Sequence, residues 1–269
     1  MRSLPRTPLP EKPPSAAQCP NCGSALPPGQ FCPGCGQPRH HRLTTSHVLH
    51  ELLHVFTHAD KSIFAYAGRV LARPARPVTD YLAGRRRRHF NPFQFLLLAV
   101  GLTTLLTTSF HFYEQLGTGV QARMAAQGAP AALLARAGTY FQTLGRFVNV
   151  WSLGLLPLFA LVAWGAYRRR GLNYAESFLV VVVVGSAYQL WLGGVLLGWL
   201  GATGGKLPAF SLAPLQAAVY LVYLTAIGRG ALGLGWGGAL GRALLVTLLA
   251  SAIGLALNYV LFQLYVLGG

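Results

Sequence analysis

Charge is scarce in this sequence of 269 residues, because Asp, Glu, Lys and Arg make up only 10% of it, against about 25% in a typical soluble domain. Acidic residues are the scarcest, with 6 Asp and Glu against 22 Lys and Arg, so the formal net charge is +16. This deficit, with 53% hydrophobic residues, excludes a typical soluble domain and indicates a membrane protein. The basic excess favours contact with anionic lipid head groups or, as an alternative, with nucleic acid.

The first 30 residues also lack the apolar stretch of a secretory signal peptide, so we expect no cleavable export signal there. Residues 1–17 are rich in proline and are expected to form a disordered tail. The apolar stretches of the chain are continuous rather than alternating, which makes β-strands unexpected.

Five apolar stretches approach the roughly 20 residues that cross about 30 Å of bilayer hydrocarbon. They are residues 93–112, 147–167, 175–200, 212–227 and 243–267, and the fourth is the shortest. Asn91 fits the N-cap of the first helix, with Pro92 at its first position. Asn173 and Glu176 fit a capping box before the third. We expect about five spans within a transmembrane domain of residues 91–269, with four spans as the alternative.

Lys and Arg are unevenly distributed around these spans. If the N-terminus is cytoplasmic, 18 basic residues lie on the cytoplasmic side, and the exported segments keep only Arg123, Arg136, Arg146 and Lys206. Cytoplasmic loops carry such an excess, so we predict a bacterial cytoplasmic (inner) membrane protein whose C-terminus is exported. The residues expected to contact anionic head groups, at about 1 kcal/mol per charge, are Arg85, Arg86, Arg87 and Arg88. The longest exported connection, residues 113–146, is expected to contain a surface helix.

All four cysteines lie in one stretch with the pattern Cys19-x2-Cys22-x9-Cys32-x2-Cys35. Two such pairs can supply four thiolates to a tetrahedral metal ion, and a glycine after each pair allows backbone amides to turn toward the sulfurs. The nine-residue gap is shorter than the usual spacing of about 15–20 residues and fits a compact zinc ribbon over residues 18–38. Four protein ligands leave no open coordination position, so we expect one structural zinc ion rather than a catalytic one.

Two alternatives exist for these cysteines. A rubredoxin-like iron site would use the same four ligands. Two disulfides are the other alternative, but stable disulfides are rare in the reducing cytoplasm, where the charge distribution places this segment.

Residues 39–90 are expected to form a basic, amphipathic helical collar between the ribbon and the spans, with one helix at about 61–73 ending at the sequence RPARP. An earlier helix carries the sequence His50-Glu51-Leu52-Leu53-His54, which matches HExxH, a pattern in which both histidines bind zinc and the glutamate is a general base. A metalloprotease centre and a non-catalytic second metal site at His50, His54 and His58 are therefore alternatives. We favour a solvated polar helix face, because no third ligand is evident.

The order of these features resembles the bacterial domain-of-unknown-function family 3667. The resemblance is carried by the CxxCG…FCxxCGQ ribbon, by Arg42-Leu43-Thr44, by the block RPVTDYLAGRRRRHFNPFQF and by NYAESF. The ribbon followed by Tyr81-Leu82-Ala83-Gly84-Arg85 is the more specific part, although this chain is richer in Ala, Gly and Arg than the family pattern. The resemblance implies an integral membrane protein with a zinc ribbon and implies no activity.

Together these features predict an all-α polytopic membrane protein with a small N-terminal zinc ribbon. We expect a scaffold or regulatory protein rather than an enzyme, with a cytoplasmic protein partner at the ribbon and a second copy of the chain as a further candidate partner. No ionisable residue lies deep in a span, which disfavours the transporter alternative. Nucleic acid is not an expected partner, because no reading helix or interleaved aromatic residues accompany the basic run.

Overall fold

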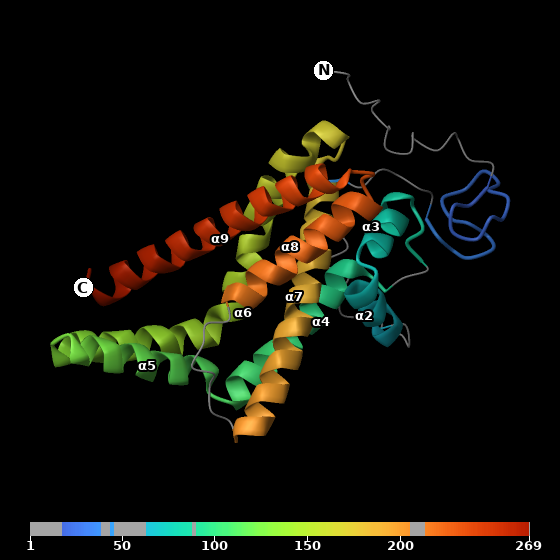
Figure 1. Cartoon of the computed structure of the whole chain (residues 1–269). Helices are drawn as coiled ribbons and strands as arrows, with labels where there is room; N and C mark the ends of the chain where they lie inside the picture. The colour runs from blue at the N-terminus through green and yellow to red at the C-terminus, as the bar shows by residue number, and fades with distance from the viewer. Residues whose placement is uncertain (1–17, 39–43, 46–62, 88–89, 205–212, 269) are drawn as a thin grey trace, which may run out of the picture.

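A computed structural model of the chain describes residues 18–38, 44–45, 63–87, 90–204 and 213–268. In these residues the secondary structure is helical apart from two isolated β-bridges in the ribbon, which confirms the predicted all-α fold class. The elements are α2 (Ile63–Ala72), α3 (Ala75–Leu82), α4 (Pro92–Ser109), α5 (Phe112–Ala126), α6 (Ala131–Tyr167), the 3-10 turn η1 (Arg168–Arg170), α7 (Tyr174–Thr203), α8 (Ala213–Gly230) and α9 (Trp236–Val266) (Figure 1).

Four of the described segments are long and apolar enough to cross a membrane: α4, Val150–Arg170, α7 and α9. The chain therefore has the architecture of a multi-pass membrane protein. The fourth predicted span is a helix, α8, but it is not among the four, because polar side chains such as Gln216 and Arg229 make it less apolar. It nevertheless packs along α7 and α9.

The predicted N-caps are present at two of these helices. The side-chain oxygen of Asn91 accepts a hydrogen bond from the amide of Phe93 (2.9 Å), with Pro92 at the first position of α4. Asn173 and Glu176 form the reciprocal capping box at the start of α7, with both hydrogen bonds at 2.8 Å. Each cap stabilises its helix by about 1 kcal/mol. The starts of α4 and α7 therefore lie where the capping residues predicted them.

A short helix after α2 was not predicted. α2 ends at Ala72, as the sequence RPARP indicates, but α3 begins directly after Pro74 and includes Pro77 in its first turn. Proline is tolerated there because the first amides of a helix have no partner within the helix. The same residues that end α2 therefore also start α3.

The connection expected at residues 113–146 is a helical hairpin rather than a loop with a surface helix. α5 and the first half of α6 lie side by side, and the C-terminal part of α9 lies beside them (Figure 1). α6 then continues without interruption into the bundle, where Pro157 lies inside the helix. A proline within a helix removes a hydrogen bond and bends it, and α6 changes direction along its length in Figure 1.

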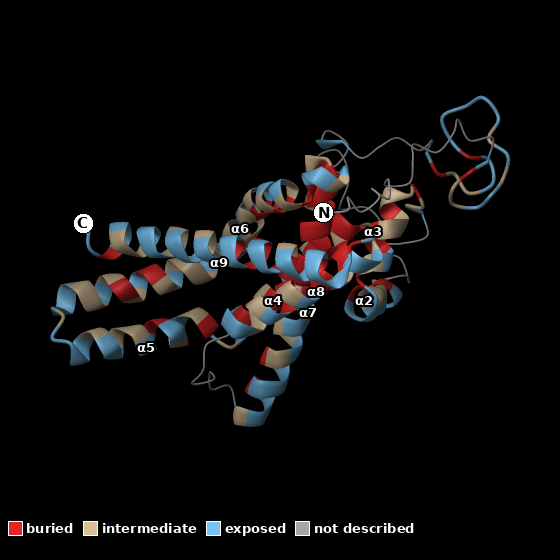
Figure 2. Cartoon of the chain, turned by 45° about the horizontal axis from the view of Figure 1, so that its top comes forward, coloured by how far each residue is buried: buried red, intermediate tan, exposed pale blue. Residues whose placement is uncertain are grey.

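The core surrounds α7, which packs against α4, α6 and α8, and buried residues are concentrated there in Figure 2. The run Val180–Val184 of α7 is buried throughout, and Phe93 of α4 stacks on Phe178 of α7 with ring centroids 5.9 Å apart. Most of α9 is exposed instead. Its glycines Gly237 and Gly241 face open space, as do Gly194 and Gly198 of α7, since an added Cβ would meet nothing within 4 Å.

Candidate metal centre

Two loops of the same shape hold the four cysteines. In each loop the amide of the glycine after the second cysteine donates to the carbonyl of the first cysteine, Gly23 to Cys19 (2.8 Å) and Gly36 to Cys32 (2.7 Å). These glycines have φ of 77° and 63°, in the left-handed region where a side chain is unfavourable. The sequence CxxCG therefore encodes each turn locally.

The two loops bring all four predicted ligands together. The Sγ atoms of Cys19 and Cys35 are 3.7 Å apart, those of Cys22 and Cys32 are 3.6 Å apart, and all four lie within 4.8 Å of one another. Thiolates placed tetrahedrally about 2.3 Å from a metal would be about 3.8 Å apart. The cluster thus has the size of a four-thiolate metal site. All four cysteines are free, at distances well above the roughly 2.05 Å of a disulfide.

The two sides of this cluster differ in acidity. Hydrogen bonds from the side chain and backbone of Ser24 lower the pKa of the exposed Cys22 to about 6. Burial raises the pKa of Cys32 to about 11. Because metals bind the thiolate form, ion binding by the metal-free cluster at neutral pH must displace a proton from Cys32 but not from Cys22.

Gln37 connects the ribbon to the helical body. Its side chain is 3% exposed, its Nε2 donates to the carbonyl of Gly84 (2.6 Å), and its Oε1 accepts from the amides of Arg86 (3.3 Å) and Arg87 (3.4 Å). Gly84 has φ of 82° just after α3 ends, the left-handed conformation common at helix ends. The Arg87 guanidinium also lies against Gly36 of the second loop. The ribbon is therefore docked on the end of α3.

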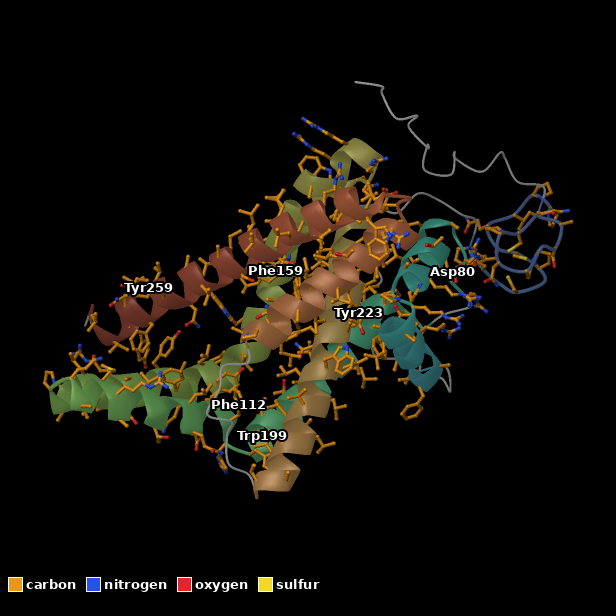
Figure 3. All side chains as sticks on the ribbon, viewed as in Figure 1. Asp80, Phe112, Phe159, Trp199, Tyr223 and Tyr259 are labelled. Carbon is orange, nitrogen blue, oxygen red and sulfur yellow. The ribbon has the colours of Figure 1, made fainter. Side chains whose placement is uncertain are left out.

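The end of α3 is itself held in place. Arg85 donates to the carboxylate of Asp80 through Nε (2.9 Å) and Nη2 (2.5 Å) (Figure 3). The guanidinium of Arg86 lies 5.0 Å from the ring centroid of Tyr81, and Tyr81 packs edge-on against Phe93 at the start of α4. Through Tyr81 and Phe93, the joint between the ribbon and α3 is therefore in contact with α4, the first candidate span. The ion pair with Asp80 also neutralises part of the Arg85 charge within the chain.

Basic residues from distant parts of the sequence meet at this end of the bundle. Arg242 of α9 donates to the carbonyl of Ala166 (3.2 Å), next to the three arginines of η1. Arg229 of α8 lies 3.6 Å over the ring of Trp236, and the neighbouring Gly230 touches Ala75 of α3. The ends of α3, α6, α8 and α9 therefore form one basic face on the ribbon side.

The other predicted site residues lie outside the described residues. These are His50, Glu51, His54 and His58 of the HExxH helix, together with Arg88. The metalloprotease and second-metal alternatives therefore stay untested predictions.

The sequence pattern predicted that the four cysteines come together but gave no role to Gln37. A weak signal was present, because Gln37 directly follows the second CxxCG turn, and an amide side chain can donate and accept at once. Its partner Gly84 is 47 residues away, and no local pattern links the two.

Residues 62–104 match the family described as "Protein of unknown function (DUF3667)", which confirms the resemblance over the block RPVTDYLAGRRRRHFNPFQF, while the other motifs lie outside the match. The match includes α2, α3 and most of α4, so it contains the end of α3 on which the ribbon docks. No curated protein and no solved structure matches the chain.

Proposed function

We propose that this chain, which shares the DUF3667 segment, is an inner-membrane scaffold whose ribbon holds one structural zinc ion and binds a cytoplasmic protein. The observation that carries the proposal is the buried joint between Gln37 and Gly84. A ribbon on a flexible linker would sample many positions, whereas a docked ribbon holds a partner at one place on the membrane face. The scaffold role needs that fixed position.

Zinc is the metal that the ligand set favours. Tetrahedral four-sulfur sites suit zinc or iron, and a closed site that only stabilises a fold needs no redox chemistry. The nearby guanidinium of Arg87 offsets the net negative charge of four thiolates around a divalent ion. In this proposal the four cysteines hold the ion and have no catalytic task.

Phe31 is the proposed anchor for the partner. It lies just before Cys32 in the sequence and is 59% exposed, and Pro27 and Pro28 of the same ribbon are exposed as well. Exposed aromatic side chains are enriched in protein interfaces, where they carry much of the binding energy. The small ribbon therefore offers exposed apolar side chains to a partner.

The basic face supports the proposed side of the membrane. Positive residues of α3, η1, α8 and α9 gather at the end that carries the ribbon. Segments with such an excess of Lys and Arg stay in the cytoplasm and are attracted to anionic lipids. This supports a cytoplasmic ribbon on the bacterial inner membrane.

The test combines metal analysis with site-specific crosslinking in cells. A photoreactive residue at position 31 should give one defined protein adduct, and the purified chain should contain one zinc ion. Cys32→Ser with Cys35→Ser should abolish both the metal and the adduct formed by a photoreactive residue at position 30. Phe31→Ala should weaken that adduct while retaining zinc.

Phe64→Ala is the matched control, because Phe64 of α2 is 87% exposed but lies outside the ribbon. It should leave the adduct unchanged. Equal crosslinking in Phe31→Ala and Phe64→Ala would contradict the proposed anchor, and purified chain without zinc would contradict the metal assignment.

A further inference from the structure

The four ribbon cysteines differ in how far solvent reaches them. The first cysteine of each loop is buried, with Cys19 3% exposed and Cys32 2% exposed. The second cysteine of each loop is more accessible, since Cys22 is exposed and Cys35 is partly exposed. Each loop therefore presents one cysteine to solvent and keeps the other inside the cluster.

The dock on α3 makes the two accessible cysteines unequal. Gly23 and Gly36 occupy the same position in the two loops, directly after Cys22 and Cys35. A Cβ added at Gly36 would lie 3.4 Å from the guanidinium carbon of Arg87. Among the described residues, a Cβ added at Gly23 would meet nothing within 4 Å. The helical body thus covers the second loop, and Cys22 is the cysteine most open to a dissolved reagent.

The exposed Cys22 has a buried thiol beside it on the other loop. Its Sγ lies 3.6 Å from the Sγ of Cys32, which is van der Waals contact. The loops approach this closely because Gly34 has no side chain. A Cβ added there would lie 2.5 Å from the hydroxyl oxygen of Ser24 and 3.6 Å from the Sγ of Cys22. An accessible thiol next to a second thiol is the arrangement found in redox-sensitive cysteine pairs.

Oxidation by a hydroperoxide would use both of these sulfurs. The Cys22 thiolate attacks one peroxide oxygen, so that the O–O bond breaks and the S–O bond of a sulfenic acid forms, and the leaving hydroxide takes up a proton. The Cys32 thiolate then attacks this sulfur, the S–S bond forms, and the S–O bond breaks, so that a second hydroxide leaves and takes up a proton. Two thiolates, one hydrogen peroxide and two protons give one disulfide and two waters.

A disulfide between Cys22 and Cys32 would remove two of the four thiolates. Structural zinc sites use four protein ligands, so the remaining Cys19 and Cys35 would not hold the ion. Other thiols reverse the reaction, because thiolates attack disulfides by exchange, and the cytoplasm keeps thiols reduced. A disulfide formed in this way is therefore a reversible modification.

We propose that hydroperoxides oxidise the ribbon at Cys22 and that Cys32 closes the product to a Cys22–Cys32 disulfide, which releases the metal ion. The inference rests on the proposed function only for the released ion, because the disulfide depends on the two sulfurs alone. The Sγ atoms of Cys19 and Cys35 are also close, at 3.7 Å. That pair is not the first to react, because its accessible member lies on the docked loop.

Hydrogen peroxide treatment of the full chain, purified in detergent, tests the proposal. Remaining thiols are blocked with N-ethylmaleimide, and chymotrypsin cleaves after the exposed Phe31, which separates the two loops into different peptides. The peptides should stay joined by one disulfide, and fragmentation in the mass spectrometer should place the bond between Cys22 and Cys32. Zinc released to a chromogenic indicator should equal the disulfide in amount. This mapping uses the wild type, so it does not depend on the folding of a variant.

Two matched variants, each lacking one cysteine of the second loop, identify the resolving thiol. Cys32→Ser should stop at the sulfenic acid of Cys22, which dimedone labels, whereas Cys35→Ser should still form the disulfide and leave little label. Equal labelling of Cys22 in both variants would overturn the proposal. So would wild-type peptides that separate after peroxide, or a bond placed between any other two cysteines. A chain purified without zinc that forms the Cys22–Cys32 disulfide would contradict the metal assignment and support this modification.

Discussion

Replacing Gln37 with alanine should release the ribbon from the helical body without releasing the proposed zinc ion. The side chain makes the hydrogen bonds to Gly84, Arg86 and Arg87. It is not one of the four cysteine side chains that would bind the metal. The backbone carbonyl of Gln37, which accepts from the amide of Cys32 (2.8 Å), remains in the variant. The turn around the metal should therefore survive while the joint is lost.

The magnitude follows from the hydrogen bonds. A typical intramolecular hydrogen bond contributes about 0.5–1.5 kcal/mol net. The bond to Gly84 is short at 2.6 Å, and the two bonds to Oε1 are long at 3.3 and 3.4 Å and share one acceptor. Counting the long pair as a single bond gives about 1–3 kcal/mol, which shifts the docked-to-undocked equilibrium by about 5- to 150-fold.

Hydrogen–deuterium exchange at the amides of Arg86 and Arg87 measures this shift, because both amides donate to the side chain of Gln37 in the docked ribbon. Gln30→Ala is the control, since Gln30 is an exposed glutamine of the same ribbon. Exchange should accelerate in Gln37→Ala alone, at unchanged zinc content. If exchange at Arg86 and Arg87 stayed at the wild-type rate, or if zinc were lost, the joint assigned to Gln37 would be wrong.

Two further outcomes are expected. Zinc affinity should fall as pH decreases and should fall more steeply below about pH 6. The reason is that a proton competes with the metal at Cys32 (pKa about 11) over this whole range, whereas a proton competes at Cys22 (pKa about 6) only in acid. A competition titration with a chelator from about pH 8 to 5 measures the affinity, and a pH-independent affinity would refute the prediction. Gly230→Val should lower the melting temperature in detergent, because its Cβ would lie 2.6 Å from Ala75 and overpacking costs about 1–3 kcal/mol. Gly237→Val, in open space, should not, and equal melting temperatures would contradict the α3–α8 contact.

Features encoded by neighbouring residues were predictable from the sequence. The four clustered cysteines lie within 17 residues, Cys19 to Cys35, and the CxxCG turns need only glycine at positive φ. Asn91 and Asn173 cap their helices through amides two or three residues away. The apolar spans were found because crossing hydrocarbon demands a continuous run of apolar side chains. The helix α3 was not predicted, because the prolines indicate the end of α2, whereas prolines also occur in the first turn of a helix.

By itself, then, the sequence determined the cysteine turns, the helix starts and the membrane class, each of which depends on residues close together in the chain. The tertiary structure alone decided that Gln37 meets Gly84 and that arginines of α8, α9 and η1 gather at one end of the bundle. These features depend on how helices pack and bend, and packing joins residues whose separation along the chain carries no periodic signal. The ribbon is thus a local structure, and its fixed place on the membrane domain is a property of the whole fold.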